Sequence, residues 1–270
     1  MSALPSALAD LTKVTCRLEN DGMLLWAQLD SPPGNVLDGE MMASLRKVVE
    51  AANGLPALRL LVFSGAGANF SFGASVEEHL PDRVGGMLES FHGLFRDLME
   101  CDVPALALVR GQCLGGGLEL AAFCDRVVVE DGAQLGQPEI RLGVFAPVGS
   151  LVLPWRCGAR SSDLLLTGRS MNASSAVECG LADEKVEQGQ GEKAVENWLG
   201  ETLAKLSASS LRFARRASRW QMHRMLRQGM EELERFYLDE LMSWRHTGLR
   251  FSRKERIPSA ASWVDRSSSR

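Results

Sequence analysis

Two glutamates in this sequence, Glu119 and Glu139, stand twenty residues apart, and each lies close to glycines. Two carboxyl groups in one site can divide the movement of protons, because one accepts a proton while the other donates one. Burial raises the pKa of a carboxyl group, so that one member of a pair can hold its proton near neutral pH. The pair therefore predicts general acid–base chemistry. Which glutamate is the acid and which the base is left open.

The residues around Glu119 predict a site for a negative charge. The apolar run 103–109 indicates a buried strand, the glycines at 115–117 allow the backbone to approach a ligand, and residues 118–123 indicate the start of a helix. A strand, a glycine turn and a helix direct free backbone N–H groups and the positive end of a helix dipole at one point. Such a point suits a developing oxyanion. A tight strand-to-helix junction is the alternative explanation for these glycines.

The same order of elements recurs along the first part of the chain. Three segments show a strand, a turn and a helix, and a further strand follows the third. The predicted strands are residues 24–29, 58–63, 103–109 and 126–130, and the predicted helices are residues 39–52, 84–100 and 118–123. Alternation of this kind predicts an α/β fold with right-handed crossovers.

Strand signals disappear beyond about residue 192. Residues 193–206, 207–220 and 222–244 have helical patterns, and the end of the chain is polar. We therefore divide the chain into an α/β core that carries the site, residues 1–192, and a helical C-terminal region, residues 193–270. We expect the C-terminal helices to pack on the core or on a neighbouring subunit and to cover the pocket.

Composition narrows the class of partner. The chain has 270 residues, 45% of them hydrophobic, and a formal net charge of −4, which gives no general reason to expect nucleic acid or an anionic membrane as a partner. Its apolar runs are far shorter than the roughly 20 residues of a membrane span. Residues 1–11 do not have the pattern of a secretory signal. We expect a cytoplasmic protein.

The sequence gives no indication of a metal or nucleotide cofactor. Its six cysteines are scattered and its four histidines show no ligand spacing, so we expect free thiols and no metal. The glycines at 115–117 lack the G-x-G-x-x-G spacing of a dinucleotide site. We expect no cofactor.

Three segments resemble motifs of the crotonase (enoyl-CoA hydratase/isomerase) family, in that family's order and spacing. Residues 70–75 are similar to F-S-A-G-A-D, residues 111–125 to G-x-x-x-G-G-G-x-E-L-A-x-x-C-D, and residues 136–143 to F-G-x-P-E-x-x-x-G. The resemblance extends from about residue 24 into the C-terminal helices, and it implies a spiral of ββα units. It also implies a homo-trimer or homo-hexamer that binds an acyl-CoA thioester, with coenzyme A as part of the substrate.

The resemblance assigns roles to single residues by their place in the motifs. It implies that the backbone N–H groups of Ala74 and Gly116 form an oxyanion hole, and that Glu119 and Glu139 occupy the two catalytic positions of hydratases. Family members that lack a glutamate perform isomerase, dehalogenase or hydrolase chemistry, so the presence of both indicates addition of water. The other residues expected to bind substrate are Phe72, Gly73, Ser75, Val76, Gly115 and Phe145.

Two departures from the common family pattern narrow the resemblance. Ser75 stands where an aspartate is usual, and residues 145–150 replace a turn rich in proline and glycine. Residues 70–79 in combination with residues 136–147, and also residues 206–213, resemble the hydratases of cyclohexa-1,5-diene-1-carbonyl-CoA, which act in anaerobic benzoyl-CoA degradation. The resemblance implies a reversible 1,4-addition of water that gives 6-hydroxycyclohex-1-ene-1-carbonyl-CoA. The alternatives are a general 2-enoyl-CoA hydratase or isomerase, and a non-catalytic homologue that binds acyl-CoA or RNA.

Two further features leave alternatives open. Arginines at 212, 215, 216 and 219 share one face of a predicted helix. That face either is solvated and pairs with the glutamates at 231, 232 and 234, or contacts CoA phosphates, or binds RNA. We expect His79 to be a hydrogen-bonding residue of a loop, and a place over the acyl pocket is the alternative.

Overall fold

The computed structural model describes residues 3–75, 77–80 and 82–243. Its larger sheet has six strands in the order β1-β2-β3-β4-β6-β9, and every neighbouring pair except β1 and β2 is parallel. Parallel neighbours require crossover connections, which here contain helices. The strands are β1 (Val14–Glu19), β2 (Leu24–Leu29), β3 (Leu60–Gly65), β4 (Ala105–Val109), β6 (Arg126–Glu130) and β9 (Glu184–Val186).

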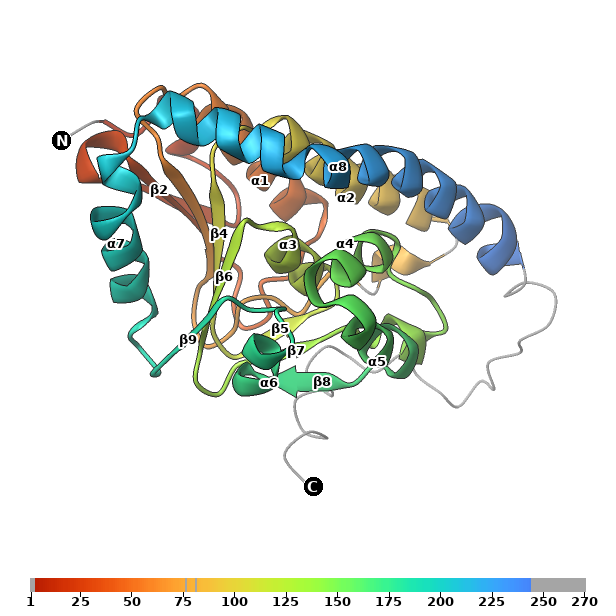
Figure 1. The fold of residues 1–270 in the computed structure, drawn as a ribbon. Coiled ribbons are helices and arrows are strands. Elements are labelled where there is room, and N and C mark those ends of the chain that lie inside the picture. Colours follow the sequence, from red (N-terminus) through yellow and green to blue (C-terminus); the bar gives the residue numbers. More distant parts are fainter. Residues whose placement is uncertain (1–2, 76, 81, 244–270) are drawn as a thin grey trace.

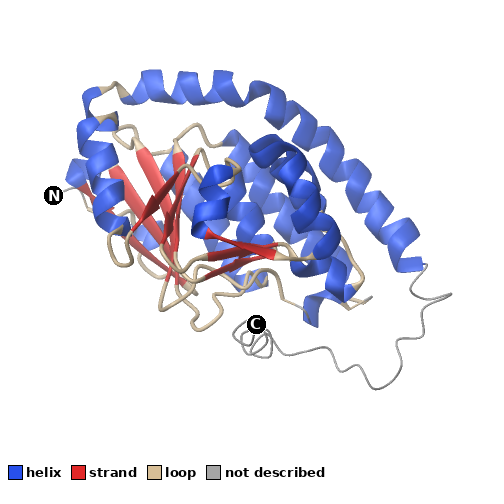
Figure 2. Ribbon diagram, turned by 60° about the horizontal axis from the view of Figure 1, so that its bottom comes forward, coloured by secondary structure: helices blue, strands red, loops and turns tan. Residues whose placement is uncertain are grey.

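A second, three-stranded sheet is formed by the later turns of the fold. It contains β5 (Gln112–Leu114), β7 (Gln134–Gly136) and β8 (Ser170–Asn172). The chain passes from β4 into β5 and then into α3 (Gly116–Phe123), and it passes likewise from β6 into β7. Each such turn adds one strand to each sheet, which is the predicted spiral of ββα units (Figure 2).

Helices cover both faces of the larger sheet because its strands are apolar on both sides. Leu25 and Leu61 point into the main core, with α1 (Gly39–Asn53) and α2 (Val84–Glu100). Trp26 and Val62 point to the opposite face, which is covered by α7 (Gly191–Glu201). The remaining α-helices are α4 (Pro147–Cys157), α5 (Ser161–Thr167), α6 (Ala173–Glu178) and α8 (Ala208–Arg235).

The predicted strands and helices of the core are confirmed, with ends that differ by at most two residues from those expected. The C-terminal helices differ more. Residues 207–220 and 222–244 do not form separate helices: α8 begins after its N-cap Ser207 and continues as a π-helical turn, Phe236–Leu241. No proline or glycine stands between residues 207 and 222 to interrupt it. Residues 244–270 lie outside the described residues.

The long helix α8 runs along one side of the molecule and lies against α2 and α4 (Figure 1). The preceding helix, α7, packs on β4 and β6 and ends before a short 3₁₀ turn, Leu203–Lys205. The division of the chain at residue 192 stays a prediction. In the described part of the chain, no helix is long and apolar enough to cross a membrane.

Candidate active site

A buried asparagine holds the loop at residues 70–75 in place. The Asn35 amide, which is fully buried, donates to the carbonyl oxygens of Ala66 at 3.0 Å and Asn69 at 2.9 Å. Ser71 Oγ donates to the Asn35 carbonyl at 2.8 Å, and the Leu114 N–H donates to the Ser71 carbonyl at 2.9 Å. These bonds fix the loop against β5 and the glycine turn that follows β5.

Two backbone N–H groups of these segments lie close to each other. Gly73 has φ +94°, and a Cβ on it would lie 2.7 Å from the Leu114 carbonyl oxygen and 3.0 Å from the Gly116 nitrogen. A Cβ on Gly116 would in turn lie 3.3 Å from the Ala74 nitrogen. Only glycine allows this approach. Within the described residues, neither the Ala74 N–H nor the Gly116 N–H donates a hydrogen bond, so both are free to bind an oxygen of a ligand.

Glu119 lies in the first turn of α3 and is almost completely buried, with 3% of its surface exposed. Its Oε1 accepts a hydrogen bond from the Gly149 N–H, at the start of α4, over 2.5 Å. A carboxylate at the N-terminus of a helix is favoured by the helix dipole. The Gly149 bond fixes the direction in which this carboxyl group faces.

Glu139 lies in the 3₁₀ turn Pro138–Leu142 and is adjacent to Gly115. Gly115 has φ +53°, and a Cβ on it would overlap with Glu139 Oε1. Glu139 Oε2 is buried and, among the described residues, has no hydrogen-bond partner. The second glutamate therefore lies against the same glycine turn from which Glu119 begins its helix.

Burial raises the pKa of both carboxyl groups. For Glu119 burial is the largest cause, the charge of Glu139 raises the pKa further, and the Gly149 hydrogen bond opposes the rise. For Glu139 burial is again the main cause. Because two buried like charges are unfavourable, the pair retains a proton at a pH where an exposed carboxyl group would have lost it. One carboxylic acid and one carboxylate can therefore coexist, as acid–base catalysis requires.

The other predicted substrate-binding residues have different surroundings. Phe72 is half-buried and its ring lies against Gly34. The Ser75 carbonyl accepts a hydrogen bond from His79 Nδ1 at 2.7 Å, which confirms His79 as a hydrogen-bonding residue of the loop. Phe145 is half-buried, and its ring centroid lies 5.3 Å from that of Phe236 and 5.2 Å from that of Tyr237. Val76 lies outside the described residues.

Three residues near the site were missed by sequence reasoning. Phe91, on α2, has its ring against Gly116. Gly149 holds Glu119, and Gln137 lies beside Glu119 across Gly149. Gly149 lies in the unusual segment 145–150, and Gln137 lies in the segment 136–143 that contains Glu139. Their contacts join residues far apart in the sequence, so no local pattern could predict them.

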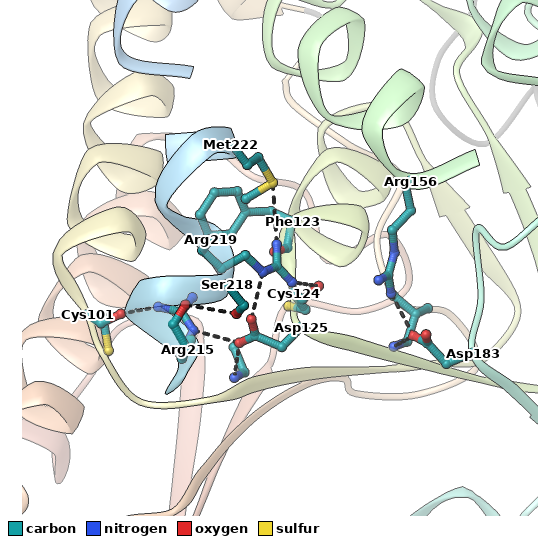
Figure 3. Close-up of polar contacts among 12 residues, drawn as sticks. Cys101, Phe123, Cys124, Asp125, Arg156, Asp183, Arg215, Ser218, Arg219 and Met222 are labelled. Carbon is teal, nitrogen blue, oxygen red and sulfur yellow. Dashed lines mark hydrogen bonds and ion pairs between the residues drawn. The ribbon is translucent and has the colours of Figure 1, made fainter. Parts of the chain in front are cut away.

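The arginines on one face of α8 bind this helix to the core of the protein. Arg215 Nε lies 2.6 Å from Asp125 Oδ2 and Arg219 Nε lies 2.8 Å from Asp125 Oδ1, and both guanidinium groups are buried (Figure 3). Arg212 donates to the Leu55 carbonyl at 2.7 Å, and Arg216 pairs with Asp102. The predicted pairing with the glutamates at 231, 232 and 234 was therefore wrong, and Arg215 and Arg219 are not solvated, whereas Arg216 is exposed. Because Arg215 and Arg219 are buried, they cannot bind CoA phosphates or RNA.

All six cysteines are free thiols, as expected. Over the described ranges, no group of three or more histidine, cysteine, aspartate or glutamate side chains is arranged to hold a metal ion.

Comparison with known proteins places this site in a family. The family model described as enoyl-CoA hydratase/isomerase matches residues 19–249. The cyclohexa-1,5-dienecarbonyl-CoA hydratase of Thauera aromatica is 46% identical over 84% of this chain and 87% of its own length. A probable enoyl-CoA hydratase of Rhizobium meliloti is 32% identical over 83% of this chain and 88% of its own.

Comparison with solved structures also finds enoyl-CoA hydratases. The crystal structure of an enoyl-CoA hydratase from Mycobacterium avium subsp. paratuberculosis superposes with a TM-score of 0.78 and 18% identity, over 95% of this chain and 97% of that one. At that identity the likeness concerns the fold alone. The family match and the identity to these hydratases agree with the glycine turn and the paired glutamates of the site. This chain belongs to the enoyl-CoA hydratase/isomerase (crotonase) family.

Proposed function

We propose that this protein is a hydro-lyase that adds water reversibly, in a 1,4 manner, to cyclohexa-1,5-diene-1-carbonyl-CoA and gives 6-hydroxycyclohex-1-ene-1-carbonyl-CoA. The observation that carries the proposal is the 46% identity, over most of both chains, to the Thauera aromatica hydratase of that substrate. The retention of both glutamates beside the glycine turn supports it. The reaction would belong to anaerobic degradation of aromatic compounds through benzoyl-CoA.

The two free N–H groups supply the electrostatic part of the mechanism. The thioester carbonyl oxygen binds between the N–H groups of Ala74 and Gly116, where negative charge develops when the ring accepts a nucleophile. Loss of one such donor typically costs about 3–4 kcal/mol of transition-state stabilisation. These groups are backbone atoms in a rigid turn, so they need no rearrangement during the reaction.

The glutamates supply the proton transfers. A carboxylate of the pair accepts a proton from water as its oxygen bonds to the ring carbon β to the carbonyl, and the π electrons move to the carbonyl oxygen as a dienolate. The protonated carboxyl group then donates its proton to the remote end of the dienolate. This leaves the ring double bond conjugated with the thioester. The total charge of the pair is unchanged, but its proton now lies on the other carboxyl group, and exchange with solvent restores the starting arrangement. The raised pKa values of Glu119 and Glu139 support this division of roles.

Four further properties are part of the proposal. Phe72, Gly73, Ser75, Val76, Gly115 and Phe145 would contact the acyl-CoA. The enzyme would be a homo-trimer or homo-hexamer, and it would act in the cytoplasm. It would need no metal or other cofactor, because the oxyanion hole and the two carboxyl groups account for every step. Light scattering of the purified protein, and activity after dialysis against a chelator, test the oligomer and the metal independence.

The substrate is tested by a direct comparison. Purified protein is assayed with cyclohexa-1,5-diene-1-carbonyl-CoA and with crotonyl-CoA, and the product of the diene is analysed after reaction in deuterated water. The proposal requires preference for the diene and deuterium on the ring carbon remote from the thioester. A clear preference for crotonyl-CoA, or deuterium on the α-carbon, would indicate the general 2-enoyl-CoA hydratase instead.

A further inference from the structure

Gln137 has a buried amide that nothing in the fold explains. It lies between β7 and the turn that carries Glu139, and only 1% of its surface is exposed. Neither Nε2 nor Oε1 of this side chain has a hydrogen-bond partner among the described residues. An unpaired buried polar group costs about 1–3 kcal/mol of stability. An apolar side chain at this position would avoid that cost, so the presence of an amide needs an explanation other than stability.

The amide and the carboxyl group of Glu119 border the same space beside Gly149. A Cβ on Gly149 would lie 3.1 Å from Gln137 Nε2 and 3.2 Å from Glu119 Oε1, so both polar groups border the volume that a single methyl group would fill. Glu119 cannot turn away from that volume without losing the Gly149 N–H bond. A group that can donate and accept hydrogen bonds therefore faces the same small region as a catalytic carboxyl group.

We propose that Gln137 is a positioning residue, whose amide orients the attacking water and, in the reverse direction, the hydroxyl group of the product. The inference rests on the proposed hydratase function but not on the identity of the acyl group. An amide can give one hydrogen bond to a water oxygen and accept one from its proton, which leaves the second proton for a carboxylate. As the C–O bond forms, the O–H bond to this second proton breaks and the proton passes to the carboxylate. In the reverse direction, the carboxyl group returns the proton to the leaving hydroxyl group.

The test compares ligands with and without the hydroxyl group. Gln137→Met keeps the length of the side chain and removes both hydrogen-bonding groups. We measure kcat and KM for hydration, and inhibition constants for the hydroxylated product and for cyclohex-1-ene-1-carbonyl-CoA, which lacks the hydroxyl. Gln134→Met, at a half-buried glutamine on β7, is the matched control for the loss of an amide.

We expect kcat to fall at least about 30-fold in Gln137→Met, because misplacement of a reacting group can cost about 100-fold. Affinity for the hydroxylated product should fall about tenfold, the usual worth of one lost hydrogen bond, while affinity for the analogue without hydroxyl stays unchanged. The thermal midpoint should be unchanged or higher, because an unpaired buried amide has been removed. The control variant should match the wild type in kcat, in KM, in both inhibition constants and in the thermal midpoint.

Three outcomes would overturn the proposal: kcat within about threefold of the wild type, equal weakening of both ligands, or a lower thermal midpoint in Gln137→Met, which would show a purely structural amide. Gly149→Ala is a second variant, because its methyl group fills the volume beside the amide; it should show the same selective loss. If the wild type hydrates only crotonyl-CoA, the diene assignment fails, and the same comparison with 3-hydroxybutyryl-CoA and butyryl-CoA still decides the role of Gln137.

Discussion

At the scale of single residues, the site depends on two carboxyl groups close to one glycine turn, of which Glu119 is almost completely buried and Glu139 is half-buried with its Oε2 shielded from solvent. Glu119→Gln and Glu139→Gln should each lower kcat by at least about 100-fold, the usual contribution of a general acid or base, with little change in KM. Gln has nearly the same shape and can still accept the Gly149 N–H bond at position 119, so the loss would report proton transfer rather than a collapsed site. Steady-state kinetics on folded variants test this, and near-wild-type turnover in either one contradicts the assignment.

The raised pKa of Glu119 also predicts how stability changes with pH. Burial, followed by the charge of Glu139, raises this pKa above its ordinary value of 4.5 in the folded state, so the folded protein binds a proton that the unfolded chain has released. Stability is then lost as pH rises from about 4.5 toward the folded pKa, by at most about 1.4 kcal/mol for each pH unit. Gln cannot ionise and avoids this loss.

Glu119→Gln should therefore match the wild type in unfolding free energy near pH 4.5 and become the more stable protein as pH rises. Urea unfolding at several pH values measures the difference. Glu89→Gln, at an exposed position on α2, controls for removal of one negative charge. A constant difference between Glu119→Gln and the wild type across this range would show that the folded-state pKa is not raised.

At the scale of elements, the glycine turn between β5 and α3 determines where the groups meet. Gly115 combines φ +53° with a Cβ position that overlaps Glu139, so Gly115→Ala should both strain the backbone and displace the glutamate. We expect a loss of about 1–2 kcal/mol from the backbone and a fall in kcat of about 100-fold. Gly189→Ala is the matched control, because Gly189 has φ +80° and open space around its Cβ position.

The control should lose similar backbone stability and keep its kcat. Circular dichroism during thermal unfolding and steady-state kinetics separate the two effects. If both variants keep full activity, Glu139 can move away from a Cβ at position 115 without harm, and the contact is not part of the site's geometry.

The elements that sequence predicted well are those with local periodicity. Apolar runs located β2, β4 and β6, and helical spacing located α1 and α2 almost to the residue. The glycine turn and the two glutamates were also found from residue type and spacing. By contrast, β5, β7 and β8 have three residues each, and their pairing depends on partners far along the chain, so no local pattern announces them.

The same reason explains the parts of the site that were missed. The Gly149 N–H reaches Glu119 only because α4 packs against α3. Gln137 comes near the same place because the strand before it, β7, pairs with β5, the strand that precedes α3. The arginines of α8 were located on one helical face but given the wrong partners. Their actual partner, Asp125, is distant in sequence and is reached only when α8 lies along the core.

At the scale of the whole molecule, a buried ion cluster joins the C-terminal helix to the core near the site. Asp125 follows α3 and accepts the Ala105 N–H at the start of β4, as well as both arginines of α8. Arg219 also donates to the carbonyls of Phe123, at 3.0 Å, and Cys124, at 2.8 Å, at the end of α3. The helix that carries Glu119 at its beginning is thus bound to α8 at its end (Figure 3).

Removal of the central carboxylate should therefore be costly for the whole fold. Asp125→Asn leaves the buried guanidinium groups of Arg215 and Arg219 without a counter-charge, and breaking a buried ion pair from one side typically costs about 3–5 kcal/mol. The control is Arg216→Ala, because the Arg216 side chain is 63% exposed and pairs with Asp102 at the surface. Such a surface pair is worth about 1 kcal/mol or less. Urea unfolding of both variants measures the two free energies. Equal, small losses would show that α8 is held by its apolar contacts through Met222, Leu226 and Met230 rather than by the ion cluster.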